Sequence, residues 1–174
     1  MEQIVPATQF DLRHTPLRDV NAALHAPDLT GDFVVRHPAG AHNVAVGLDA
    51  PVTVTVDGHV GYYAAGMNQR ADVVIHGNAG TGVAENMMSG TVWVKGDASQ
   101  SAGATAHGGL LVIEGNAAAR CGISMKGVDI VVKGSIGHMS AFMAQAGTLT
   151  VLGIDIAQDP QSVQDRIGYM PQKF

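Results

Sequence analysis

The sequence is poor in charge and in aromatic rings. Charged residues make up 14% of its 174 residues and aromatic residues 5%, and 15 acidic residues outnumber 10 basic ones. Such a chain lacks both a basic face that neutralises phosphates and aromatic platforms that stack on bases, so we do not expect it to bind nucleic acid. Its 46% of apolar residues can offset the entropy of ordering, which predicts one folded domain over residues 1–174.

Cysteine and long apolar runs are scarce as well. Cys121 is the single cysteine, which excludes an intramolecular disulfide and a cysteine-ligated zinc or iron–sulfur site on this chain. No apolar run approaches the roughly 18 residues of a membrane-spanning helix. The first residues also lack the charged-then-apolar layout of a signal peptide. We therefore predict a cytoplasmic protein without a membrane partner.

Glycine, in contrast, is abundant and recurs at a fixed period. Six glycines follow one another at intervals of 19 residues: Gly58, Gly77, Gly96, Gly115, Gly134 and Gly153. An aliphatic residue stands two positions before each of them, and another stands four positions before. This alternation is typical of a short strand with one buried face, so each repeat is expected to contain a strand that ends in a glycine turn.

The length of the repeat decides between the known repeat architectures. Nineteen extended residues at roughly 3.3 Å each span about 60 Å, which suits one coil of a triangular β-helix and is short for a propeller blade. A leucine-rich repeat would need spaced leucines and an asparagine or cysteine ladder, and we find no such ladder. The sequence thus predicts an all-β fold, a right-handed single-stranded parallel β-helix with 19-residue coils.

The register of the repeat divides the chain into three parts. Regular coils are expected over 53–152, preceded by an N-terminal cap and irregular coils over 1–52. Residues 153–174 are expected to form a tail or a capping helix. Small residues recur seven positions after the repeat glycines, and these positions are interpreted as tight corners of the coil.

Short helices are expected to cover the two ends of the stack. Thr15 and Pro16 form a helix start signal for a helix over 16–25, with Thr15 as the capping residue. A similar signal predicts a helix over 160–167. Such caps protect the open edges of a coil stack from aggregation.

The glycine-marked coils resemble a known family. The resemblance rests on VGYYAAGMNQ at 60–69, GNAGTGVAENMMSGTVWVKG at 77–96, SQSAGATAHGGLLVIEGNAAARCGISMKG at 99–127 and IVVKGSIGHMSAFMAQAG at 130–147. These stretches are similar to the GXGXG-repeat β-helix family, which includes the carboxy-terminal domain of the glutamate synthase large subunit. Within that family the chain resembles the small β-helix subunit of N-methylglutamate synthase.

The resemblance implies a non-catalytic structural subunit of a hetero-oligomeric enzyme. Its partners would be an amidotransferase-like subunit and a glutamate-synthase-like subunit that carries FMN and an iron–sulfur cluster, while this chain would hold no cofactor. The complex would convert methylamine and glutamate to N-methylglutamate and ammonia. Alternatives are a β-helix subunit of glutamate synthase or of formylmethanofuran dehydrogenase, or a β-helix that acts by itself on a polysaccharide.

Residues that could carry chemistry on this chain have simpler interpretations. The eight histidines share no repeat column, which argues against a metal site. Cys121 could act as a nucleophile with His107 as its base, but its small neighbours favour a buried corner thiol. Glu85 has no second acid in register, and the glycines of GNAGTG at 77–82 are interpreted as turn residues. We therefore predict no catalytic, cofactor-binding or metal-binding residue.

One column of the repeat is a candidate partner surface. It carries few charges and is expected to point outward: Met88, His107, Lys126 and Gln145. The alternative is an ordinary surface with one exposed methionine, and the sequence does not separate the two.

Overall fold

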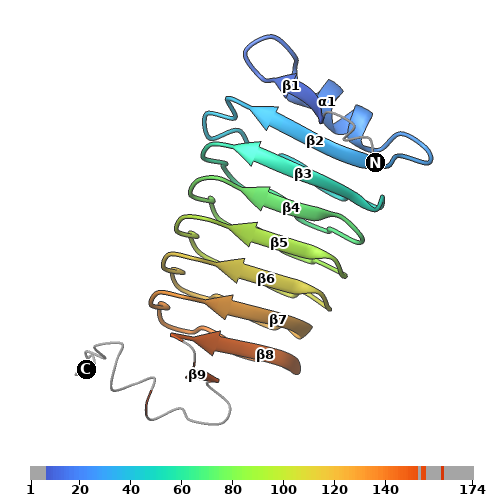
Figure 1. Cartoon of the computed structure of the whole chain (residues 1–174). Helices are drawn as coiled ribbons and strands as arrows, with labels where there is room; N and C mark the ends of the chain where they lie inside the picture. The colour runs from blue at the N-terminus through green and yellow to red at the C-terminus, as the bar shows by residue number, and fades with distance from the viewer. Residues whose placement is uncertain (1–6, 153, 156–161, 163–174) are drawn as a thin grey trace, which may run out of the picture.

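A computed structural model describes residues 7–152, 154–155 and 162. The protein is a parallel β-helix of about six coils, as predicted (Figure 1). Each coil adds one strand to a sheet whose order follows the sequence, and every neighbouring pair is parallel except the last. The strands are β1 (Thr8–Asp11), β2 (Gly31–Arg36), β3 (Val52–Asp57), β4 (Asp72–Ile75), β5 (Thr91–Val94), β6 (Leu110–Ile113), β7 (Lys126–Val132), β8 (Ala146–Val151) and β9 (Ile154–Asp155).

The 19-residue period sets the pairing from β3 to β8. Val54 lies opposite Val73, which lies opposite Val92, and the same register continues to β8. The aliphatic residues of the two repeat columns point inward and are buried from coil to coil. The core is therefore a stack of apolar columns, and each coil packs only on its two neighbours.

The first coils are longer than the regular ones. Phe33 pairs with Val54, 21 residues later, and Thr8 pairs with Phe33, 25 residues later. The longer interval accommodates helix α1 (Leu17–Leu24), which lies beside β1 and β2 at the N-terminal end (Figure 1). Val20 and Leu24 on this helix are buried in the core, so α1 closes this end of the stack.

The predicted capping of this helix by Thr15 is wrong. Pro16 is itself the N-cap residue, with φ −56° and ψ 137°, and no side chain caps the helix. The backbone N–H of Thr15 donates to the Asp11 carbonyl at 2.8 Å, which holds Thr15 in the preceding turn. At the other end, Gly153 and the helix predicted over 160–167, apart from Ser162, lie outside the described residues.

A polar side-chain ladder, which the sequence analysis did not find, runs along the outside of the coils. Its members are the residues directly after five repeat glycines: His59, Asn78, Asp97, Asn116 and Ser135. The Asn78 Oδ1 accepts the Asp97 N–H at 3.0 Å, and the Asp97 Oδ1 accepts the Asn116 N–H at 2.7 Å. The first four side chains thus each accept a backbone N–H of the next coil, and Ser135 ends the ladder.

The side of each coil opposite the strand is built from turns rather than from a strand. We call this side the turn wall and define it as the third to eleventh residues after the repeat glycine: 61–69, 80–88, 99–107, 118–126 and 137–145. Every second residue at its centre has a positive φ, as at Ala84 (55°) and Asn86 (56°). The small residues predicted at tight corners, such as Ala84 and Gly103, occupy the middle one of these positions.

Hydrogen bonds between coils continue across the turn wall in alternating directions. The Gly82 N–H donates to the Gln100 carbonyl of the next coil at 2.9 Å, and the Ala84 N–H donates to the Ala64 carbonyl of the previous coil at 3.0 Å. The Asn86 N–H donates again to the next coil, to Ala104 at 2.9 Å. Left-handed residues therefore allow a wall without strands to keep its backbone groups paired.

Candidate interaction surface

The one thiol of the chain lies inside the coil stack. Cys121 has no exposed surface, and burial raises the pKa of its thiol to about 12. A thiol with such a pKa is protonated at neutral pH and is a poor nucleophile. His107, the base considered for it, is exposed on the outside of the turn wall. The structure therefore places Cys121 as a buried structural residue.

Three histidines, His25, His42 and His59, contact the backbone through their ring nitrogens. The Nδ1 atom of His42 accepts the Tyr62 N–H at 2.7 Å, and that of His59 accepts the Asn78 N–H at 2.8 Å. These two imidazoles therefore serve as acceptors for backbone N–H groups of the next coil. Among the described residues, no group of three or more His, Cys, Asp or Glu side chains comes together to hold a metal ion.

Glu85 lies on the turn wall beside a small polar network. The Asn86 Nδ2 donates to the Tyr63 hydroxyl at 3.0 Å, and the Thr105 hydroxyl donates to the Asn86 Oδ1 at 2.6 Å. Partial burial raises the pKa of the Glu85 carboxyl. No second carboxylate faces it among the described hydrogen bonds and ion pairs, so the acid pair that glycoside hydrolysis requires is not assembled here.

The glycines of GNAGTG permit close stacking of coils. A Cβ atom on Gly77 would lie 2.8 Å from the Gly58 carbonyl oxygen, and one on Gly80 would lie 2.6 Å from that of Gly61. The segment is followed by a turn wall and then by β5, whereas a dinucleotide loop opens a helix. These residues act as turn and packing glycines.

The predicted outward column is exposed. Met88, His107, Lys126 and Gln145 lie above one another at the edge of the turn wall. Their backbones are fixed by the previous coil, since the Lys126 N–H donates to the Ala106 carbonyl at 2.7 Å and the Gln145 N–H donates to the Met125 carbonyl at 2.8 Å. The side chains are thus presented by a rigid scaffold and are accessible to a partner.

Exposed apolar side chains are concentrated on the turn wall. Seven large hydrophobic side chains are exposed among the described residues, and six of them lie there: Tyr62, Met67, Met88, Met139, Phe142 and Met143. Met88 belongs to the predicted outward column, and the other five extend the exposed apolar surface over the same wall. Large exposed apolar groups gathered on one side of a molecule are typical of interaction sites.

The outer face of the strands carries a second distinctive group. The indole N–H of Trp93 donates to Glu114 at 2.8 Å, and the Lys95 ammonium lies 3.3 Å from the centre of the Trp93 ring. Lys95 and Lys133 form ion pairs with Glu114 at 3.0 and 3.4 Å, and they lower the pKa of its carboxyl. The only tryptophan is therefore held on a face opposite the turn wall.

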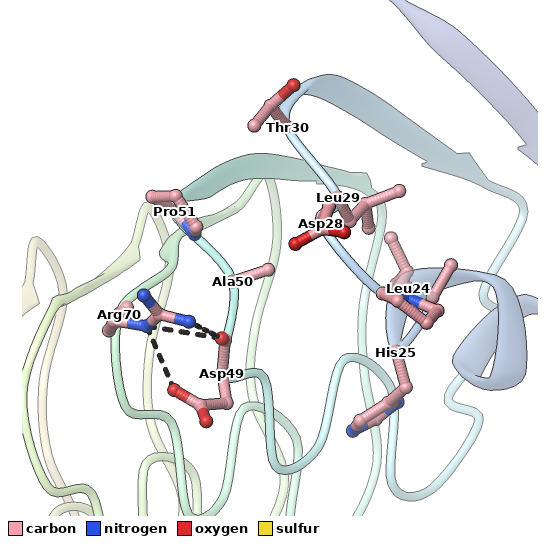
Figure 2. A pocket seen from close by; sticks show the side chains of 11 residues that line it. Leu24, His25, Asp28, Leu29, Thr30, Asp49, Ala50, Pro51 and Arg70 are labelled. Carbon is pink, nitrogen blue, oxygen red and sulfur yellow. Dashed lines mark hydrogen bonds and ion pairs between the residues drawn. The ribbon is translucent and has the colours of Figure 1, made fainter.

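A pocket of about 460 Å³ lies at the N-terminal end, between the end of α1 and the first regular coil. Figure 2 shows Arg70 joined to Asp49 beside Asp28 and His25. The Arg70 Nε lies 2.9 Å from the Asp49 Oδ1, and both side chains are exposed. Both ring nitrogens of His25 lie against backbone carbonyls, Nδ1 2.6 Å from that of Asn21 and Nε2 3.1 Å from that of Gly47, so the described hydrogen bonds do not join His25 to a carboxylate of the pocket as a matched acid and base.

No helix within the described residues is long and apolar enough to cross a membrane. Among curated proteins, the chain is similar to a protein named GlxC from Rhizobium meliloti (strain 1021), with 64% identity over 64 residues. The match comprises 34% of this chain and 27% of that protein, so the chain spans little more than a quarter of the length of GlxC. No protein-family model and no solved structure matches the sequence.

Proposed function

We propose that this chain is a non-catalytic structural subunit of a glutamate-synthase-like complex, of the N-methylglutamate synthase type. In this proposal it bridges an amidotransferase-like subunit and a subunit that binds FMN and an iron–sulfur cluster. The family resemblance of the glycine coils suggests the complex, and the similarity to GlxC supports a glutamate-synthase-related subunit.

The observation that carries the proposal is a stiff coil stack with two separate exposed surfaces. The turn wall carries exposed methionine and aromatic side chains, and the opposite face carries Trp93 with its lysines. Backbone hydrogen bonds join every pair of adjacent coils, so the distance between the two surfaces is fixed. A rigid body with two surfaces can hold two catalytic subunits at a constant separation.

The chemistry of this chain's own residues agrees with a bridging role. An iron–sulfur cluster needs several thiolate ligands, and the single cysteine of this sequence is buried. We therefore place the cluster and FMN on the partner subunit. The reaction proposed for the whole complex is the conversion of methylamine and glutamate to N-methylglutamate and ammonia.

Co-expression of the three chains tests the proposal. We expect a tag on this chain to recover both partners, together with the visible absorption of a flavin and an iron–sulfur cluster. When this chain is omitted, the two partners should no longer purify together, although each should remain folded. Recovery of this chain alone, without colour, would contradict the proposal.

The nitrogen donor then identifies the reaction. The purified complex should form N-methylglutamate from glutamate and methylamine. Activity with glutamine and 2-oxoglutarate instead would assign it to a glutamate synthase, and inactivity with both donors would favour another complex of the family, since a shared fold does not fix the reaction.

A further inference from the structure

The last coil ends the turn wall with a cluster of exposed apolar side chains. Met139 is 43% exposed, Phe142 51% and Met143 68%. Arg120 and Lys126 lie in the coil directly above, and we call these five residues the end patch. The Arg120 N–H donates to the His138 carbonyl at 2.9 Å, next to Met139, which fixes the basic and apolar members of the patch against each other.

The end patch also presents unused backbone donors. In the coil above, the N–H groups of Arg120 and Ser124 donate to carbonyls of the last coil, the latter to Phe142 at 2.8 Å. Met139 and Met143 occupy the same repeat positions one coil later. Their N–H groups have no acceptor among the described residues. The patch therefore offers two backbone donors at positions where a stacked coil would supply acceptors.

The charged residues of the end patch are both basic, whereas the net charge of the chain is −5. The turn wall of the last two coils, 118–126 and 137–145, contains no Asp or Glu. Arg120 and Lys126 are exposed, and neither has an ion-pair partner in the part of the chain that the structure describes. Most other described basic side chains, such as Arg70 and Lys95, are paired. The patch thus lacks the negative charge that would complement it.

A hollow at this end of the described coils is lined by sequence neighbours of Lys126, Phe142 and Met143. It has a volume of about 280 Å³ and is lined by Met125, Ala141, Ala144, Gln145, Ala146, Gly147 and Leu149. The lining is almost entirely apolar, so the hollow can take an apolar side chain. An apolar anchor within a rim of charge is the arrangement that carries most of the energy in protein interfaces.

We propose that the end patch docks one of the two partner subunits, through a segment with an apolar anchor flanked by carboxylates. The anchor enters the hollow beside Phe142 and Met143, the carboxylates pair with Arg120 and Lys126, and acceptors on the segment bind the N–H groups of Met139 and Met143, which have no acceptor among the described residues. This inference rests on the proposed function. It adds the surface that is used and the chemistry of the segment that binds there.

Substitutions in the patch, tested in the co-expressed complex, provide the experiment. Met143→Gln combined with Phe142→Ser should weaken the affinity for one partner at least about tenfold and leave the other partner bound. Met67→Gln is the matched control, because Met67 occupies the same repeat position four coils away, with φ 54° against 57° for Met143. This variant should weaken the affinity for that partner less than the double variant does, because Met67 lies on the turn wall outside the end patch.

Charge reversal tests the second part of the inference. Lys126→Glu combined with Arg120→Glu should release the same partner, and binding by the unaltered patch should weaken as salt rises, because exposed charge pairs are screened over about 8–10 Å. Retention of both partners by both double variants would overturn the inference while leaving the proposed function intact. If the unaltered chain binds neither partner, the proposed function itself fails.

A stability measurement tests whether a partner or another segment of this chain covers the end patch. The free energy of unfolding of the isolated chain should change little in the Phe142→Ser, Met143→Gln variant, because the patch is free until a partner binds. A clear loss of stability in the isolated chain, with both partners still bound, would show that residues 156–174 of this chain cover the patch and would overturn the inference.

Discussion

Single polar side chains hold consecutive coils together where the strand has ended. The Asn78 Oδ1 accepts the Asp97 N–H at 3.0 Å, so Asn78→Ala leaves that N–H to water. We expect a loss of about 1 kcal/mol in the free energy of unfolding, measured by urea denaturation, because one hydrogen bond contributes about 0.5–1.5 kcal/mol. Ser135→Ala is the control.

The control works because the Ser135 hydroxyl makes no hydrogen bond among the described residues, although its backbone N–H is bound by Asn116 at 2.9 Å. It should therefore leave stability unchanged. If both variants lose the same free energy of unfolding, the loss comes from removing a side chain and not from removing the hydrogen bond between coils.

At the scale of one element, the turn wall contains ordinary residues in a left-handed backbone conformation. Met67 has a φ of 54°, which costs an L residue about 1–2 kcal/mol and costs glycine nothing. Met88 is equally exposed, at 48% against 46%, and its φ is not positive. Met67→Gly should therefore be more stable than Met88→Gly by about 1–2 kcal/mol in urea unfolding.

The two backbone hydrogen bonds concerned survive both substitutions, since the Met67 N–H binds Glu85 and the Met88 N–H binds Asn68, each at 2.8 Å. Both variants lose a methionine side chain of similar exposure. They therefore differ in the backbone conformation at the substituted residue. If the two glycine variants are equally unstable, the left-handed conformation of the turn wall stores no strain.

The strands were predictable from the sequence and the turn wall was not. Aliphatic residues such as Val92 and Val94 alternate on one face, and the repeat glycine marks where the strand ends, so pattern alone determines register. The left-handed positions hold Tyr63, Met67 and Thr105, none of which favours a positive φ. Hydrogen bonds to both neighbouring coils impose this conformation, and a single sequence does not reveal them.

The candidate site was predictable in part for a similar reason. The column with Met88 and Lys126 points outward because it follows the buried column by one residue, which periodicity shows. The polar ladder was missed because His59, Asn78 and Asp97 differ in type and share only a side-chain acceptor. Of the end patch, Lys126 was predicted as part of the outward column, whereas its grouping with Arg120 and the exposed apolar residues depends on the fold of the last coils.

For the whole molecule, the two ends of the coil stack differ in how well they are closed. At the N-terminal end, Val20 and Leu24 of α1 are buried against the first coils. Among the described residues at the other end, β9 pairs with β8 at Thr150 and Val151, and Ala144 and Ala146 are exposed. A stack in which each coil contacts only its neighbours opens from its less covered end.

Hydrogen exchange followed by mass spectrometry should therefore show a gradient along the isolated chain. Backbone amides of β4, β5 and β6 should exchange slowest, because their coils are packed on both sides, and those of β8 should exchange much faster. Strand β2 provides the internal control, since it lies near the opposite end and is covered by α1 and β1. Its amides should be better protected than those of β8.

Equal protection of all coils would mean that the stack unfolds as one cooperative unit, and faster exchange in β2 than in β8 would place the weak end at α1. In the assembled complex, binding of a partner at the end patch should slow exchange selectively in residues 137–151, because the partner then covers the last described coil.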